Sequence, residues 1–370
     1  KRECMGWGKA RALGRITGLL VRALAWVSLY ILGLLLSNLY SQFPSSMDVK
    51  TVQQWPTVPQ SVTSEGARDM SSHFSIQPTR LAWRASLVAA AALSWGCAQT
   101  VTDGGALREQ VVAVTAAHEL ITFNAGRPDN LLERKPVQGL PAGDKLVGID
   151  FRVAKGVLYA LSQAGRLYTL DLGGGVLTAV GTAPSAIALK GTAFGVDFNP
   201  AADRLRVVSY LGQNLRLHPD TGAAVDGDPM QPGVQADPYL RYVWSDVNHA
   251  RPPDIVAAAY TYNPTNSKIT TNYAIDRALG VLVMQGSREG ETPVISPNLG
   301  QLRTVGSLGL GALADASLDI SDVNNTALAA VRTASDPKTR LHLVDLNTGK
   351  ATPLGVVGDG SPRVGMAIEP

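Results

Sequence analysis

The chain has 370 residues and a formal net charge of +3, with 17% charged residues, 37 glycines and 22 prolines. This loop-rich composition is typical of a fold with many short strands. Part of the positive charge lies near the N-terminus, and the rest of the chain has no run of Lys and Arg interleaved with aromatic residues. The composition therefore argues against a nucleic-acid partner, which requires clustered cations.

Two apolar segments precede the body of the chain. The first, Ile16–Leu39, is long enough to cross a bilayer as a helix, for which about 20 residues are needed. The second, Leu81–Gly96, has basic residues, an alanine-rich core and small residues before Cys97. It is similar to a bacterial lipoprotein signal with Cys97 as the lipidated residue, and ordinary signal-peptide cleavage nearby is the alternative.

Two export-like segments in one chain are redundant. We expect translation to begin at Met70 and residues 1–69 to come from an over-extended gene model. The competing interpretation is a membrane anchor at 16–39 followed by a disordered linker. The predicted organisation is a leader (1–69), a secretion signal (70–97), a tether (98–110) and a folded domain (111–370). We expect an exported bacterial protein that is periplasmic, extracellular or an outer-membrane lipoprotein, with membrane contact only through the N-terminal segment or Cys97.

The body consists of repeated units of short apolar runs separated by turn residues. The stretch Gly191–Gly222 contains three such runs, and its turns carry Asn-Pro and Asp-Thr-Gly. Related units lie before and after it, and Asp150 and Asp197 occupy the same place in consecutive units, about 47 residues apart. This period is close to that of β-propeller blades.

The two ends of the body complement each other. The first unit has three strand-like runs, at 111–115, 120–124 and 136–140, and lacks an opening strand. The last residues, Val364–Glu369, are similar to that missing strand. We predict an all-β fold, a β-propeller of five four-stranded blades closed by the C-terminal strand. Six blades or an open β-sandwich are the alternatives.

The chain resembles a bacterial secreted family known as domain of unknown function 4394. The resemblance rests on the paired GxDF openings at 148–151 and 195–198 and on the run DRLRVVSYLGQNLRLHPDTG at 203–222. It extends from about Leu120 to the C-terminus. It implies a propeller-like domain behind a secretion signal, and it implies no reaction, ligand or catalytic residues.

Polar residues concentrate in the second and third units and in a long connection, 226–254. In a propeller the first strands line a central channel, and loops at one face form the usual ligand site. The candidate ligand-binding residues are Asp150, Arg152, Asp197, Asn199, Arg204, Arg206, Asn214 and Arg216, with Tyr239, Arg241 and Trp244 from the connection. The alternative, which we favour for the Asp and Arg residues, is that they pair with one another and with turn amides. For the connection, the alternative is a cover whose aromatic residues pack inward.

No catalytic motif is present in the sequence, and His residues lack metal-ligand spacing. Two functions therefore remain. The first is a non-enzymatic propeller that binds a small molecule, a glycan or an envelope protein. The second is a calcium-dependent hydrolase or lactonase for a sugar-like or small anionic substrate, in which Asp150, Asp197 and Asp319 would hold the ion.

Overall fold

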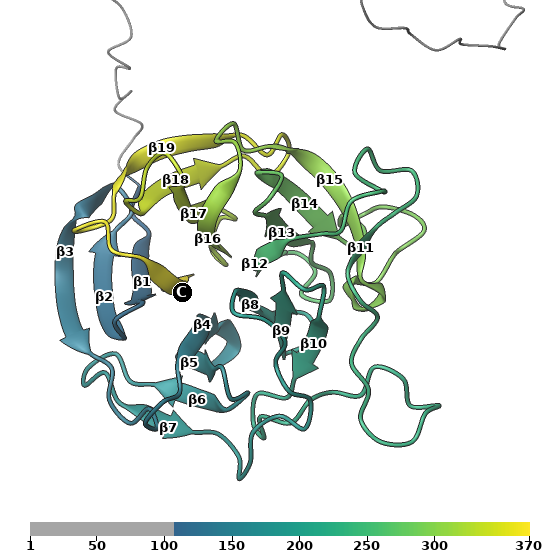
Figure 1. The fold of residues 1–370 in the computed structure, drawn as a ribbon, viewed down its shortest axis with the longest axis horizontal. Coiled ribbons are helices and arrows are strands. Elements are labelled where there is room, and N and C mark those ends of the chain that lie inside the picture. Colours follow the sequence, from purple (N-terminus) through teal and green to yellow (C-terminus); the bar gives the residue numbers. More distant parts are fainter. Residues whose placement is uncertain (1–106) are drawn as a thin grey trace, which may run out of the picture. The chain divides into compact units, whose positions relative to one another are not determined.

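A computed structural model describes residues 107–370. These residues form a ring of five sheets, shown in Figure 1, with strands β1 to β20 and two short 3-10 helices, η1 (Val153–Lys155) and η2 (Pro297–Leu299). The prediction of an all-β, five-bladed propeller is confirmed. The expectations for the leader, the signal, Cys97 and the first part of the tether lie outside the described residues. Within 107–370, no helix is long and apolar enough to cross a bilayer.

The first two blades each have four strands. Blade 1 comprises β20 (Arg363–Ile368), β1 (Gln110–Thr115), β2 (Glu119–Asn124) and β3 (Arg127–Pro136). Blade 2 comprises β4 (Leu146–Arg152), β5 (Val157–Ser162), β6 (Leu167–Leu170) and β7 (Leu177–Ala179).

Of the next three blades, two depart from the count of four strands. Blade 3 has three strands, β8 (Phe194–Asn199), β9 (Arg204–Ser209) and β10 (Asn214–Leu217). Blade 4 has five, β12 (Ile255–Tyr260), β13 (Asn272–Asp276), β14 (Val281–Gln285), β15 (Gln301–Ser307) and β11 (Arg241–Tyr242). Blade 5 has β16 (Leu313–Ile320), β17 (Ala327–Thr333), β18 (Arg340–Val344) and β19 (Ala351–Val356).

Two sequence predictions of strands were wrong. The run at 223–229 was expected to give blade 3 a fourth strand. It forms only one isolated β-bridge, between Ala224 and Leu217, because the chain then turns into the long connection. The outer strand of blade 1 is Arg127–Pro136 rather than 136–140. Its residues alternate little in polarity because it is an exposed edge, so the apolar run that follows it was the stronger signal.

The ring closes as the sequence predicted. Strand β20 pairs antiparallel with β1, with Val112 opposite Ala367 and Val114 opposite Gly365. The last strand of the chain thereby becomes the innermost strand of the first blade, and the C-terminus lies near the middle of the ring in Figure 1.

The core consists of apolar clusters at the contacts between adjacent blades. In β1, Val111 and Ala113 pack towards blade 5, whereas Val112 and Val114 pack towards blade 2. Successive residues of a strand point to opposite faces of the sheet. A strand whose blade lies between two other blades is therefore apolar on both of its faces. This explains the continuous apolar runs of the sequence.

The inner strands approach one another closely. A Cβ on Gly148 would lie 2.4 Å from Cγ2 of Val196, and one on Gly195 would lie 2.5 Å from the backbone carbon of Ala257. The glycine of each GxDF opening therefore allows first strands of neighbouring blades to meet at the centre of the ring. This contact brings Asp150 and Asp197, which lie two residues after these glycines, into one small space.

Candidate functional site

One position of the innermost strand recurs in all five blades. It is occupied by Asp150 on β4, Asp197 on β8 and Asp319 on β16, and by Ala259 and Ala367 in the two other blades. Hydrogen bonds between neighbouring blades show which positions are equivalent. Each aspartate accepts one from the backbone N–H of the residue that follows the equivalent position in the next blade. Three carboxylates thus project from three strands towards one axis.

These hydrogen bonds join neighbouring blades. The N–H of Phe198 donates to Oδ2 of Asp150 at 2.6 Å, and the N–H of Tyr260 donates to Oδ1 of Asp197 at 3.0 Å. The N–H of Ile368 donates to Asp319 and so links blade 5 to the closing strand. Each aspartate therefore has a structural role as well as a free face towards the axis.

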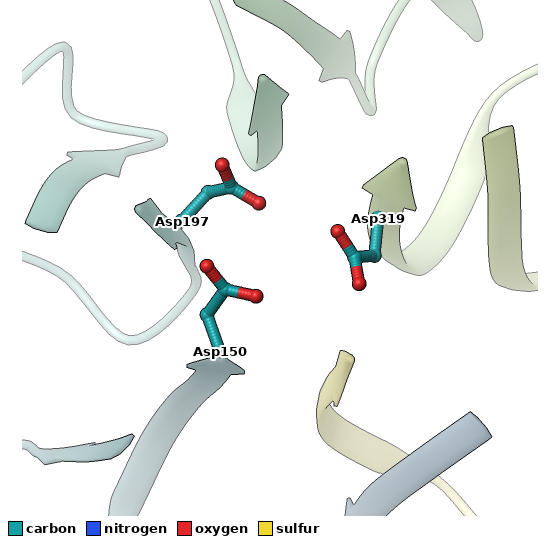
Figure 2. A group of neighbouring side chains, drawn as sticks. All are labelled: Asp150, Asp197 and Asp319. Atoms are coloured by element: carbon teal, nitrogen blue, oxygen red, sulfur yellow. The ribbon is translucent and has the colours of Figure 1, made fainter. Parts of the chain in front are cut away.

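The three carboxylates converge. Each offers an oxygen within 4.8 Å of the oxygens of the other two, and all three side chains are buried. Figure 2 shows Asp150 and Asp197 on one side of the axis and Asp319 on the other, with their oxygens directed towards a shared centre. Two ligand oxygens of one Ca²⁺, each at about 2.4 Å, can be up to about 4.8 Å apart, so the spacing fits a single ion.

Burial and mutual repulsion shape the titration of this group. Desolvation, followed by the neighbouring charge of Asp319, raises the pKa of Asp150 well above its ordinary value. Desolvation, followed by the charges of Asp150 and Asp319, does the same to the pKa of Asp197. Burial raises the pKa of Asp319 to about 6. Like charges this close either share protons or bind a cation.

A pocket of about 250 Å³ lies over the carboxylates. Its aromatic walls include Phe151, Tyr260 and Tyr262. Its charged lining is unbalanced, since it has five carboxylates and one guanidinium: Asp150, Asp197, Asp203, Asp319, Asp322 and Arg152. Such a lining favours a cationic occupant.

The one cation of the lining is already neutralised. Nε of Arg152 donates to Asp203 at 2.7 Å, and Nη1 donates to Asp220 at 2.6 Å. The hydrogen bond from Arg152, with that of Lys155, lowers the pKa of Asp220 to about 2. Among the described residues, no basic side chain is paired with Asp150, Asp197 or Asp319.

The model of a family described as Domain of unknown function (DUF4394) matches residues 119–367. The chain belongs to this family. A comparison with curated proteins gives no match. Similar solved structures include a nidogen/laminin complex, with 12% identity, a TM-score of 0.39, and coverage of 71% of this chain and 98% of that chain. The glutaminyl cyclase of Myxococcus xanthus has 12% identity, a TM-score of 0.36, and coverage of 65% and 99%. Likenesses this remote carry no argument about function.

In this DUF4394 propeller, the predicted site residues fall into two groups. Asp150, Arg152, Asp197 and Asn199 line the pocket, as does the calcium candidate Asp319. Oδ1 of Asn199 also accepts from the N–H groups of Ala201 and Ala202 at 2.9 and 3.0 Å and so holds the turn after β8.

The remaining polar candidates of blade 3 lie outside the pocket lining. Arg206 is 1% exposed, and its Nη1 donates to Asp237 at 2.9 Å and to Asn214 at 2.8 Å. Arg216 also donates to Asp237, at 2.6 Å. Arg204 donates to the carbonyl oxygen of Asp203 at 2.8 Å. These contacts match the alternative in which the charges pair within the ring.

The aromatic residues of the long connection differ in exposure. Tyr239 is 54% and Trp244 86% exposed, so the alternative of a connection that packs its aromatic residues inward was wrong for these two. Tyr242 is buried and donates to Asp276 at 2.7 Å. Arg241, Tyr239 and Trp244 do not line the pocket. The connection crosses the outer edge of blade 4, where β11 pairs with β15, and this takes it away from the axis.

Sequence reasoning missed Tyr260, Tyr262 and Asp322. Asp322 is half-buried at the pocket, and burial raises its pKa. Aligning Leu318-Asp319-Ile320 with the GxDF openings would have placed an acid three residues beyond the recurring aspartate. The tyrosines gave no signal, because their proximity depends on how blade 4 is placed in the ring.

Proposed function

We propose that this propeller is a calcium-dependent binding module. Asp150, Asp197 and Asp319 hold one Ca²⁺ at the floor of the pocket, and the positions of the ion that face the pocket bind oxygen atoms of a small polar or anionic ligand. Carboxylate oxygens suit this ion, which takes about 6–8 oxygen ligands. Three protein carboxylates leave positions for water or ligand.

The observation that carries the proposal is the unpaired state of the three buried carboxylates. Isolated buried charge is costly unless it is paired, protonated or bound to metal. Within residues 107–370, backbone N–H groups donate to these carboxylates, a hydrogen bond between the carboxyl groups of Asp197 and Asp319 contributes to their pKa values, and no basic side chain forms a salt bridge with any of the three. A divalent cation offsets the repulsion of all three at once.

Calorimetric titration of metal-free protein with CaCl₂ tests the proposal. We expect one site per chain and a loss of binding in Asp150→Asn and Asp197→Asn, which retain an oxygen acceptor for the N–H of the next blade. Asp171→Asn is the matched control, since Asp171 is exposed and accepts from Gly174 in a hairpin turn. Absence of binding by the wild type, or undiminished binding by both pocket variants, would overturn it.

A second candidate function, hydrolysis, is favoured by Asp322. Its carboxylate lines the pocket beside the trio and has no side-chain partner among the described residues. In a hydrolase, the ion would polarise a carbonyl group and Asp322 would accept the proton of the attacking water. Screening lactones and esters with the wild type and Asp322→Asn tests this. Turnover that needs calcium and is lost in the variant would make the module an enzyme.

We also propose that the protein is exported, because Leu81–Gly96 has the composition of a secretion signal and Cys97 stands where a lipoprotein is lipidated. Mass spectrometry of the native N-terminus distinguishes lipidation at Cys97 from simple cleavage. A peptide from residues 41–69 in the purified protein would contradict a start at Met70.

A further inference from the structure

A second pocket lies between blades 4 and 5, outside the central pocket. It has a volume of about 670 Å³. Its walls come from the start of β13, the start of β17, and the turn from β18 to β19. Its lining is mixed, with hydroxyl and amide groups at Thr326, Thr352 and Asn347 and apolar surface at Tyr273 and Leu346. We refer to it as the blade 4–5 groove.

The two acidic side chains of the groove are satisfied by the protein. Oε2 of Glu289 accepts from Nδ2 of Asn263 at 2.7 Å, and Oε1 accepts from the hydroxyl of Thr261. Asp345 accepts from the N–H of Asn347 at 2.8 Å, and this hydrogen bond lowers the pKa of Asp345. Neither carboxylate is paired with a basic side chain among the described residues.

The two basic side chains of the groove have no carboxylate partner among the described residues. The guanidinium of Arg288 donates only to neutral oxygens among the described residues, Oδ1 of Asn347 at 2.8 Å and the carbonyl of Leu346 at 3.4 Å. Nζ of Lys350 makes no hydrogen bond or salt bridge within residues 107–370. By contrast, Arg216 and Arg277 each have a carboxylate within 3 Å, at 2.6 and 2.9 Å. The groove therefore presents to its occupant two cationic groups without a carboxylate partner, beside two carboxylates whose oxygens already accept hydrogen bonds from neutral groups.

A short clamp separates the groove from the central pocket. The N–H of Tyr262 donates to Oδ1 of Asn325 at 2.8 Å, and Nδ2 of Asn325 donates to the carbonyl of Tyr262 at 2.9 Å. Tyr262 lines the central pocket, whereas Asn325 lines the groove. The two cavities are neighbours with a fixed wall between them, so each can be occupied alone.

We propose that the blade 4–5 groove is a second ligand site, specific for an anionic, hydroxylated molecule of the sugar-acid class. Arg288 and Lys350 bind the oxyanion, since a guanidinium and an ammonium together satisfy a carboxylate. Asn347, Thr326 and Thr352 bind ring hydroxyls, and Tyr273 and Leu346 contact the apolar face of the ring. This occupant is opposite in charge to the Ca²⁺ ion proposed for the central pocket.

Titration of the purified protein with D-glucuronate, D-glucose and inorganic phosphate tests this inference. We expect binding of glucuronate, with glucose and phosphate each at least tenfold weaker. Lys350→Gln is expected to weaken glucuronate binding at least tenfold, because the lost charge has no structural partner. Lys338→Gln is the control, since Lys338 is exposed on the β17–β18 turn and does not line the groove.

The results separate the two sites. The Asp197→Asn variant is expected to lose calcium binding and to retain glucuronate binding. The Lys350→Gln variant is expected to retain calcium binding and to bind glucuronate more weakly. Equal binding of glucose and glucuronate, or glucuronate binding unchanged in Lys350→Gln, would overturn the groove assignment whatever the outcome for calcium. Phosphate binding as tightly as glucuronate would show a simple anion site and would also overturn it.

Discussion

Oδ2 of Asp319 on β16 accepts a hydrogen bond from the N–H of Ile368 on β20. The same carboxyl group therefore ties blade 5 to the strand that closes the ring and faces the axis of the pocket. Asp150 has the same two roles at the contact between blades 2 and 3, and Asp197 at the contact between blades 3 and 4. The candidate ion site and the joints between blades are thus one set of residues.

We expect the Asp197→Asn variant to separate these two roles. The amide oxygen still accepts from Tyr260, and removal of one carboxylate relieves repulsion, so the metal-free variant should melt at or above the temperature of the metal-free wild type. Calcium should raise the melting temperature of the wild type only, because a ligand stabilises the state that binds it. Differential scanning calorimetry with calcium and with chelator measures both effects.

The stability of the metal-free protein should fall as the pH rises. Burial raises the pKa of Asp319 to about 6, above the unfolded value of about 3.9, and raises the pKa values of Asp150 and Asp197. The stabilising contribution is fully present below about pH 4 and is lost as the pH rises through 6 and above. Urea unfolding between pH 4.5 and pH 8, with chelator, checks the sign.

Saturating calcium should reverse the effect of this cluster on how stability depends on pH, because the ion binds the deprotonated carboxylates. Calcium binding should therefore weaken below about pH 6 and release protons, which appears as a dependence of the calorimetric heat on the buffer. A metal-free protein whose stability increases from pH 5 to pH 8 would contradict the assigned pKa directions.

Asp237→Ala should be strongly destabilising. The carboxylate is 1% exposed and pairs with Arg206, which is equally buried, and with Arg216. Removing one partner of a buried pair leaves an uncompensated charge, which lowers the free energy of unfolding by about 3–5 kcal/mol. Glu133→Ala is the control, because Glu133 is 56% exposed and its pair with Lys135 should contribute at most about 1 kcal/mol. Chemical unfolding compares the two, and equal losses would refute the assignment.

Gly195→Ala tests the close contact of the inner strands. The added Cβ would lie 2.5 Å from backbone atoms of Ala257 and Ala258, where no side chain can move aside, so we expect a loss of at least about 1–3 kcal/mol. Gly173→Ala is the matched control, since its nearest neighbour would be 3.6 Å away. A neutral Gly195→Ala would show that the first strands are not packed as described.

The sequence was sufficient for the ring but not for its irregular parts. Repeated GxDF openings and a C-terminal match to a missing strand are local patterns, and both survive in the fold. The outer strand of blade 1 was misplaced because an exposed edge strand has no apolar alternation. The three-stranded blade 3 was missed since composition alone does not show whether a run pairs.

The candidate site was partly visible in the sequence. Asp150 and Asp197 were evident from their spacing, and Asp319 was named with them as a candidate calcium ligand. The roles of the arginines depend on Asp237 and Asp203, which approach them only after the connection folds back and the turns form. The groove between blades 4 and 5 combines loops far apart in sequence, so no linear pattern indicated it.

The most direct test is a crystal structure of the protein grown with calcium, with anomalous data to identify the ion. The account predicts one ion on the axis in Figure 2, with an oxygen of Asp150, Asp197 and Asp319 each at about 2.3–2.6 Å. Carboxylates that hydrogen-bond to one another around shared protons at neutral pH, with no ion between them, would contradict it.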